Sequence, residues 1–130
     1  MADHEVADLA FRFVECINRQ DLDGLLDLMT EDHSLYVLGD HDVIGKENQR
    51  EAWRGYFDLC PEYMIHVWEM HVRGQTAILV GSTTGSHLKL PRLDEFRDPL
   101  IWTAKVRDGK VGEWALHHLT DENRNSLGIA

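Results

Sequence analysis

The sequence is poor in the residues that mark several large classes of protein. Only 13 residues are Lys or Arg, against 23 that are Asp or Glu, so the formal net charge is −10. Binding to nucleic acid or to an anionic membrane surface requires clustered positive charge, and we expect neither partner here. Cysteine is also scarce. Cys16 and Cys60 form no C-x-x-C pattern, so we expect two reduced thiols in a cytoplasmic protein.

Long apolar stretches are missing as well. No stretch has the length typical of a transmembrane helix, and the residues after Met1 show no basic segment followed by an apolar one, so no signal peptide is predicted. Hydrophobic residues make up 43% of the chain and charged residues 28%, as in ordinary globular proteins. The 130 residues predict a single domain over 1–130, with a polar tail over 120–130 that we expect to be mobile.

The N-terminal half has the spacing of helices. Apolar residues such as Leu9, Phe13 and Ile17 recur every three or four positions and predict a first helix with one buried face. A short second helix is expected from Leu22. A third is expected over 46–59, ending before Pro61. Between the second and third helices, residues 33–38 are extended and apolar, which indicates a strand.

The C-terminal half is typical of a sheet. Strands are expected over 64–72, 76–87, 100–107 and 110–119, with a loop over 88–98, and Asp108-Gly109 is a strong hairpin signal. The pattern predicts an α+β fold, in which a curved antiparallel sheet wraps around three N-terminal helices. Such an arrangement forms a cone, and the open end of the cone is a natural pocket for a small molecule.

Residues 12–32, RFVECINRQDLDGLLDLMTED, resemble the opening of the nuclear transport factor 2-like superfamily. They are most similar to steroid delta-isomerases and SnoaL-like polyketide cyclases. Gly45 and the segments 81–87 and 106–114 are also similar to the family, so the resemblance covers nearly the whole chain. It implies a cystatin-like roll with one pocket, and a homodimer formed through the outer face of the sheet. We expect no cofactor.

The catalytic groups of these relatives are not present. Phe13, Val37 and Trp102 stand where delta-isomerases have a tyrosine, a carboxylate base and a protonated acid. Phe13 has no hydroxyl, Val37 cannot accept a proton, and an indole N–H is only a weak substitute donor. Leu116 and Leu119 stand nearest to the acid that SnoaL-like cyclases usually keep on the last strand. We therefore do not expect either activity to proceed through its usual residues.

Two histidines are candidates for acid–base chemistry. Along the last strand, His118 alternates onto the face of Trp114, and the resemblance puts both in the pocket. On an earlier strand, His66 shares a face with Met64, Trp68 and Met70 and could join His118 there. Imidazole titrates near neutral pH, so both could move a proton or hold a ligand. A histidine hydrogen-bonded at the pocket rim explains His118 as well.

No metal site is predicted. His66 and His118 lack a third ligand at a recognisable spacing, and a solvated turn accounts for the adjacent Asp40, His41 and Asp42.

The expected pocket is apolar, and its function stays open between three hypotheses. The predicted ligand contacts are Phe13, Val37, Trp53, Ser82, Thr84, Trp102 and Trp114. The first hypothesis is a domain that binds a small apolar molecule. The second is a cofactor-independent isomerase, dehydratase or cyclase that uses a pocket histidine. The third is a non-catalytic dimeric module, with the pocket filled by its own side chains and an outer sheet face that includes Ile65, Val67, Ile101 and Thr103.

Overall fold

The computed structural model describes residues 1–38 and 42–129. The N-terminal half contains α1 (Asp3–Arg19), α2 (Leu22–Asp27), β1 (Met29–Val37), β2 (Val43–Ile44) and α3 (Lys46–Leu59). The C-terminal half contains β3 (Met64–Arg73), β4 (Thr76–Thr84), α4 (Arg92–Phe96), β5 (Leu100–Arg107), β6 (Lys110–His118) and α5 (Asp121–Ser126). No helix in the described ranges has the length and hydropathy needed to cross a membrane.

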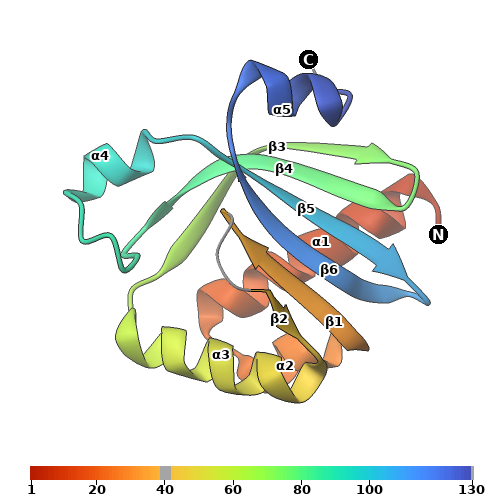
Figure 1. Cartoon of the computed structure of the whole chain (residues 1–130), viewed down its shortest axis with the longest axis horizontal. Helices are drawn as coiled ribbons and strands as arrows, with labels where there is room; N and C mark the ends of the chain where they lie inside the picture. The colour runs from red at the N-terminus through yellow and green to blue at the C-terminus, as the bar shows by residue number, and fades with distance from the viewer. Residues whose placement is uncertain (39–41, 130) are drawn as a thin grey trace.

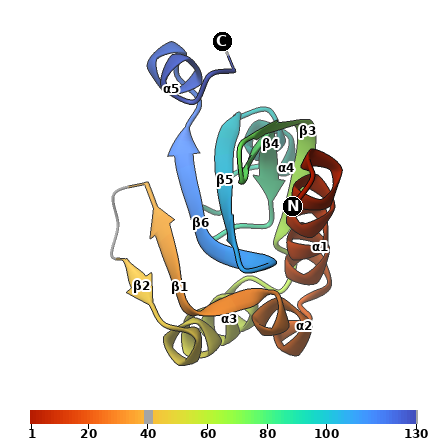
Figure 2. The same cartoon turned by 90° about the vertical axis from the view of Figure 1, so that its right-hand side faces the viewer.

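The strands form one bent sheet in the order β2-β1-β6-β5-β4-β3. The sheet curves over α1, and α2 and α3 lie together across one end (Figures 1 and 2). The predicted α+β fold with a curved sheet on N-terminal helices is therefore confirmed. The sheet is not wholly antiparallel, because β1 pairs in parallel with β6. A parallel pair needs a long crossover connection, which α3 and the intervening strands supply here.

Helix α1 fills one part of the concave side. Its buried stripe is the one that the apolar spacing predicts, and consists of Val6, Leu9, Ala10, Phe13, Val14 and Ile17. These side chains belong to one continuous core with the inner residues of β3 to β6. The position of α1 therefore decides which part of the cone is solid.

The two faces of β3 and β4 are opposite to those predicted. Ile65 and Val67 pack into the core, whereas His66 and Trp68 lie on the outer face against Phe96 of α4. A bulge between Val67 and Glu69 then shifts the register, so that Met70 also faces the core. The prediction that His66 and Met70 share a face is therefore wrong, because alternation does not continue through a bulge.

The C-terminal residues fold back onto the outer face. The Asn123 N–H donates to the Thr120 side chain at 3.0 Å, which caps α5, and Ile129 is only 5% exposed. Ile129 packs with Ile78, Val80 and Ile101 in a second, smaller apolar cluster. The residues that the sequence assigns to a polar tail thus cover part of the sheet.

Gly81 of β4 is a position where the sheet has no room for a side chain. A Cβ atom there would overlap the backbone carbonyl of His66 on the neighbouring strand. Gly81→Ala should therefore lower the free energy of unfolding by about 1–3 kcal/mol. Gly55→Ala in α3 is the matched control, because its Cβ would meet open space, and alanine should stabilise the helix by up to about 1 kcal/mol. Urea denaturation of both variants tests this, and equal stabilities would contradict it.

His33 of β1 is fully buried, and its Nδ1 lies 2.7 Å from the carbonyl oxygen of Val111. Burial is the main cause that lowers its pKa below the ordinary 6.5. The unfolded chain therefore takes up a proton at a pH where the folded chain does not, so stability falls as the pH drops from 7 towards the folded-state pKa. One such group contributes at most about 1.4 kcal/mol per pH unit.

We expect His33→Gln to flatten the dependence of unfolding free energy on pH between 7 and 5. His66 and His117 also have pKa values lowered mainly by burial, so part of the dependence should remain. His118→Gln changes an exposed side chain and should leave the slope as it is. The slope comes from denaturation curves at several pH values, and an unchanged slope in His33→Gln would exclude this origin.

Candidate functional site

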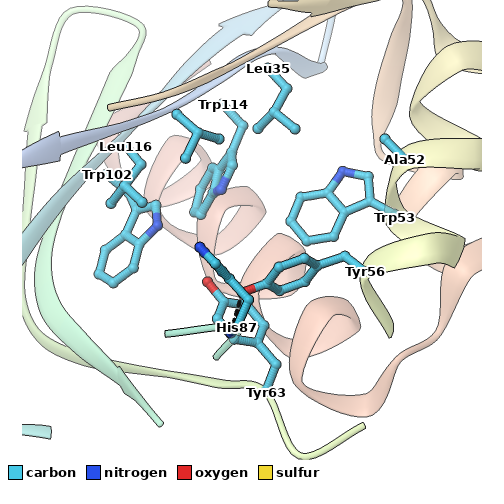
Figure 3. Close-up of a pocket in the computed structure, with 10 residues that line it drawn as sticks. Leu35, Ala52, Trp53, Tyr56, Tyr63, His87, Trp102, Trp114 and Leu116 are labelled. Carbon is cyan, nitrogen blue, oxygen red and sulfur yellow. Dashed lines mark hydrogen bonds between the residues drawn. The ribbon is translucent and has the colours of Figure 1, made fainter. Parts of the chain in front are cut away.

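A cavity of about 240 Å³ lies between α3 and the inner face of the sheet (Figure 3). Its lining is almost entirely apolar or aromatic and consists of Leu35, Val37, Ala52, Trp53, Tyr56, Tyr63, His87, Trp102, Trp114 and Leu116. The bulky side chains of the cone therefore surround an open space and do not fill it.

The strand register explains why these residues meet. Leu35 of β1 pairs with Trp114 of β6, and Leu116 of β6 pairs with both Val37 of β1 and Trp102 of β5. Residues that are paired across a sheet point to the same face, so all five side chains project to the concave side. Strands β1, β6 and β5 thus provide one wall of the cavity.

Phe13 supports this wall from behind. Its ring centroid lies 4.7 Å from that of Trp114 and 5.7 Å from that of His33, and Phe13 is fully buried. Phe13 was predicted to contact the ligand, but it is not among the residues that line the cavity. It holds the indole of Trp114 in place by packing.

Helix α3 and two connecting segments provide the opposite side. Trp53 and Tyr56 come from adjacent turns of α3, Tyr63 precedes β3, and His87 follows β4. Burial is the main cause that raises the pKa values of Tyr56 and Tyr63, so both phenols stay protonated at neutral pH.

Tyr56 and His87 form the polar part of the cavity. The Tyr56 hydroxyl lies 2.9 Å from His87 Nδ1, and the His87 backbone N–H donates to the same phenol oxygen at 3.4 Å. Because that oxygen already accepts a hydrogen bond, its own proton is best directed at Nδ1. The other ring nitrogen, Nε2, then carries a hydrogen, and it points towards Trp102 and Trp114 (Figure 3).

Glu95 of α4 anchors the segment that carries His87. Its side chain is 3% exposed and accepts a hydrogen bond of 2.5 Å from the Thr83 hydroxyl. The same carboxylate accepts from the Ser86 N–H at 3.4 Å. Since Ser86 precedes His87, these contacts fix the approach of His87 to the cavity.

The structure brings together some of the predicted site residues and separates others. Val37, Trp53, Trp102 and Trp114 line the cavity, whereas His118 is exposed at the end of β6 and lies outside it. Trp114 and Leu116 of β6 both line the cavity, as the alternation of the strand predicts. The strand continues beyond the cavity, however, and His118 lies on the part that extends past it.

The other predicted contacts lie on the outer face of the sheet. His66 pairs with Ser82, and its Nε2 lies 2.9 Å from the Thr84 hydroxyl. Ser82 and Thr84 lie on the same side of β4 as Val80, which belongs to the outer cluster beneath Ile129. The prediction that these three polar residues share the cavity is therefore wrong.

No pattern in the sequence pairs Tyr56 with His87. Tyr56 lies three positions after Trp53 on α3, and this spacing puts both side chains on one face of the helix. The sequence predicts His87 as the last residue of a strand over 76–87, whereas β4 ends at Thr84. His87 follows a turn at Gly85, where a φ of 71° ends the extended backbone. The alternation of the strand therefore does not predict where the His87 side chain points.

Across residues 1–38 and 42–129, no three His, Cys, Asp or Glu side chains are grouped so that they could hold a metal ion. Asp40 and His41, which were assigned to a solvated turn, lie outside the described residues.

The residues proposed for a dimer surface do not share one exposed face. Ile65 and Val67 face the core, and Ile101 lies under Ile129. Thr103 is buried on the outer side, where its hydroxyl lies 3.1 Å from His117 Nε2. The homodimer itself stays a prediction.

Solved structures with low sequence identity share this fold. A candidate SnoaL-like polyketide cyclase from Jannaschia sp. CCS1 has a TM-score of 0.72 at 20% identity, over 98% of this chain and 92% of that one. An uncharacterised cystatin-fold protein from Novosphingobium aromaticivorans has a TM-score of 0.73 at 18% identity, over 85% and 96%. A candidate ketosteroid isomerase from Kribbella flavida has a TM-score of 0.68 at 16% identity, over 96% and 88%.

The family is shown at the level of sequence. No functionally curated protein matches the chain. The profile of the SnoaL-like domain, however, matches residues 10–114, which include most of the cavity lining and every strand up to the middle of β6. The match confirms the resemblance that the N-terminal segment indicated, and the chain therefore belongs to the SnoaL-like domain family of the nuclear transport factor 2-like superfamily.

Proposed function

We propose that the protein binds a small, largely apolar molecule in the cavity between α3 and the sheet. The observation that carries this proposal is a formed cavity of about 240 Å³ with an aromatic lining. A buried apolar cavity of roughly 150 Å³ is enough to bind benzene, so this one has room for a molecule of one or two rings. Tyr56 and His87 supply the polar contact that would orient it.

Filling the cavity tests this proposal. Leu116→Trp adds bulk to the inner face of β6 and should weaken the binding of indane, a two-ring hydrocarbon, at least tenfold. Isothermal titration calorimetry gives the dissociation constants. Leu93→Trp on the exposed surface of α4 is the matched control and should bind indane as the unmodified protein does. Equal affinity in both variants, or no binding of any small apolar molecule, would refute the proposal.

A second candidate function is acid–base catalysis on the bound molecule. It is favoured by His87, whose Nδ1 contacts the Tyr56 hydroxyl while Nε2 faces the cavity. To remove a proton from a ligand, the ring must take its other neutral tautomer, in which Nδ1 carries the hydrogen and donates it to the Tyr56 oxygen. The free Nε2 can then accept the proton and return it to the ligand. His87 takes the place of His118 and His66 in this hypothesis, because neither of those lines the cavity.

If His87 transfers protons, the protein should accelerate exchange of the α-hydrogens of an enolisable ketone such as 1-indanone in heavy water. His87→Gln retains a polar side chain but cannot act as a base, and it should lower the exchange rate at least tenfold. His118→Gln should leave it unchanged. Proton NMR follows the loss of the α-hydrogen signal, and exchange that is no faster with protein than in buffer would exclude catalysis.

A further inference from the structure

Glu95 of α4 is a buried carboxylate with no positive charge paired to it. The residue is 3% exposed, and its oxygens accept hydrogen bonds from the Thr83 hydroxyl and the Ser86 N–H. None of the ion pairs formed within residues 1–38 and 42–129 includes Glu95. Both of its donors are neutral groups, so they replace part of the lost hydration but leave the charge itself uncompensated.

The charge of Glu95 acts on its surroundings. Burial is the main cause that raises the pKa values of Tyr56 and Tyr63, and the negative charge of Glu95 adds to both shifts. A cation bound beside Glu95 would offset this charge at short range.

A second pocket, of about 350 Å³, opens beside Glu95. It lies between the C-terminal end of α3 and the segment that joins β4 to α4 (Figure 1). Leu59, Pro61 and Leu90 provide an apolar part of its wall, and Ser86 and Glu95 belong to the same lining. The buried carboxylate thus stands at a pocket that an apolar chain can enter.

The charges around this second pocket favour a cation. Its lining contains two carboxylates, Glu62 and Glu95, and one ammonium group, that of Lys89. Lys89 is exposed and takes part in none of the ion pairs among the described residues, so it does not neutralise Glu95. The formal charge of −10 on the whole chain also attracts cations to the surface.

The donor set favours an organic cation over a metal ion. No three His, Cys, Asp or Glu side chains are grouped around a common point in the described parts of the chain, whereas a metal ion held by protein needs several ligands. A primary ammonium group needs fewer, because it carries three N–H donors and a carboxylate offers about four acceptor positions. Thr83 and Ser86 occupy part of these positions on Glu95.

We propose that this second pocket binds a small primary alkylammonium ion, which donates hydrogen bonds to Glu95 and lays its alkyl chain against Leu59, Pro61 and Leu90. The site is separate from the cavity proposed to hold an apolar molecule, although His87 belongs to both linings. Its ligand differs in charge as well as in place, so either proposal can fail without the other.

Three probes with the same short alkyl chain test the proposal on the unmodified protein. Butylamine is a cation at about pH 7.5, as a Lys side chain is, whereas 1-butanol is neutral and butyrate is an anion. Two-dimensional ¹H–¹⁵N NMR follows the signal of the Ser86 backbone N–H, which donates to Glu95. Butylammonium should shift this signal with a dissociation constant at least tenfold lower than that of 1-butanol, and butyrate should not shift it.

Three charge variants locate the site. Glu95→Gln keeps the shape and an acceptor oxygen but removes the charge, and it should weaken butylammonium at least tenfold. Asp94→Asn removes the same charge from an exposed neighbour on α4 and should leave the affinity within twofold. Lys89→Gln removes a like charge from the lining and should strengthen binding about twofold or more. The remaining signals of each spectrum show that the variant is folded.

Several outcomes would overturn the proposal. Equal affinity for butylammonium and 1-butanol would show an apolar groove without charge selectivity. Equal weakening by Glu95→Gln and Asp94→Asn would show attraction to the net charge of the protein and no defined site. A Ser86 signal that butylammonium leaves in place would exclude binding at Glu95. None of these results bears on the binding of indane in the other cavity.

Discussion

The contact between Phe13 and Trp114 divides the inside of the cone into a solid half and an open half. On one side of it, the buried stripe of α1 packs directly against the sheet. On the other side, α3 stands further from the strands and the cavity begins. Because Phe13 fixes the indole of Trp114 from behind, the shape of the open half depends on where α1 lies. A shift of this helix would change the site without altering any residue that lines it.

The polar chemistry of the site comes from a few groups held in fixed positions. The chain carries a formal charge of −10, yet none of the residues that line the cavity is Lys, Arg, Asp or Glu. Selectivity must then come from the direction of a few N–H and O–H groups in an apolar surrounding, where each hydrogen bond is stronger than in water. Glu95 acts from outside the lining by holding Ser86, and thereby the residue that carries the imidazole.

The elements with strong local signals could be predicted from the sequence, and those that depend on long-range packing could not. The bounds of α3 and β5 agree with the predicted ranges, since Pro61 and the Asp108-Gly109 hairpin delimit them. Three tryptophans of the lining were also expected in the pocket. The face of β3 that packs into the core could not be predicted, because alternation separates two faces of a strand without saying which one is buried. The bulge between Val67 and Glu69 then exchanges the two faces for the rest of the strand. The direction of His87 depends on a turn and on the distant side chains of Tyr56 and Glu95, which no local pattern reports.

The parallel pairing of β1 with β6 has a consequence for how the protein is made. Leu35 and Trp114 are neighbours in the wall of the cavity, but they come from the first long strand and the last one. Nearly the whole chain must leave the ribosome before these two strands can meet, and closing so long a loop is slow compared with forming a local hairpin. We therefore expect β3 to β5 to assemble first and β1 to dock late, so that a nascent chain shorter than β6 exposes the apolar surface that later becomes the binding site.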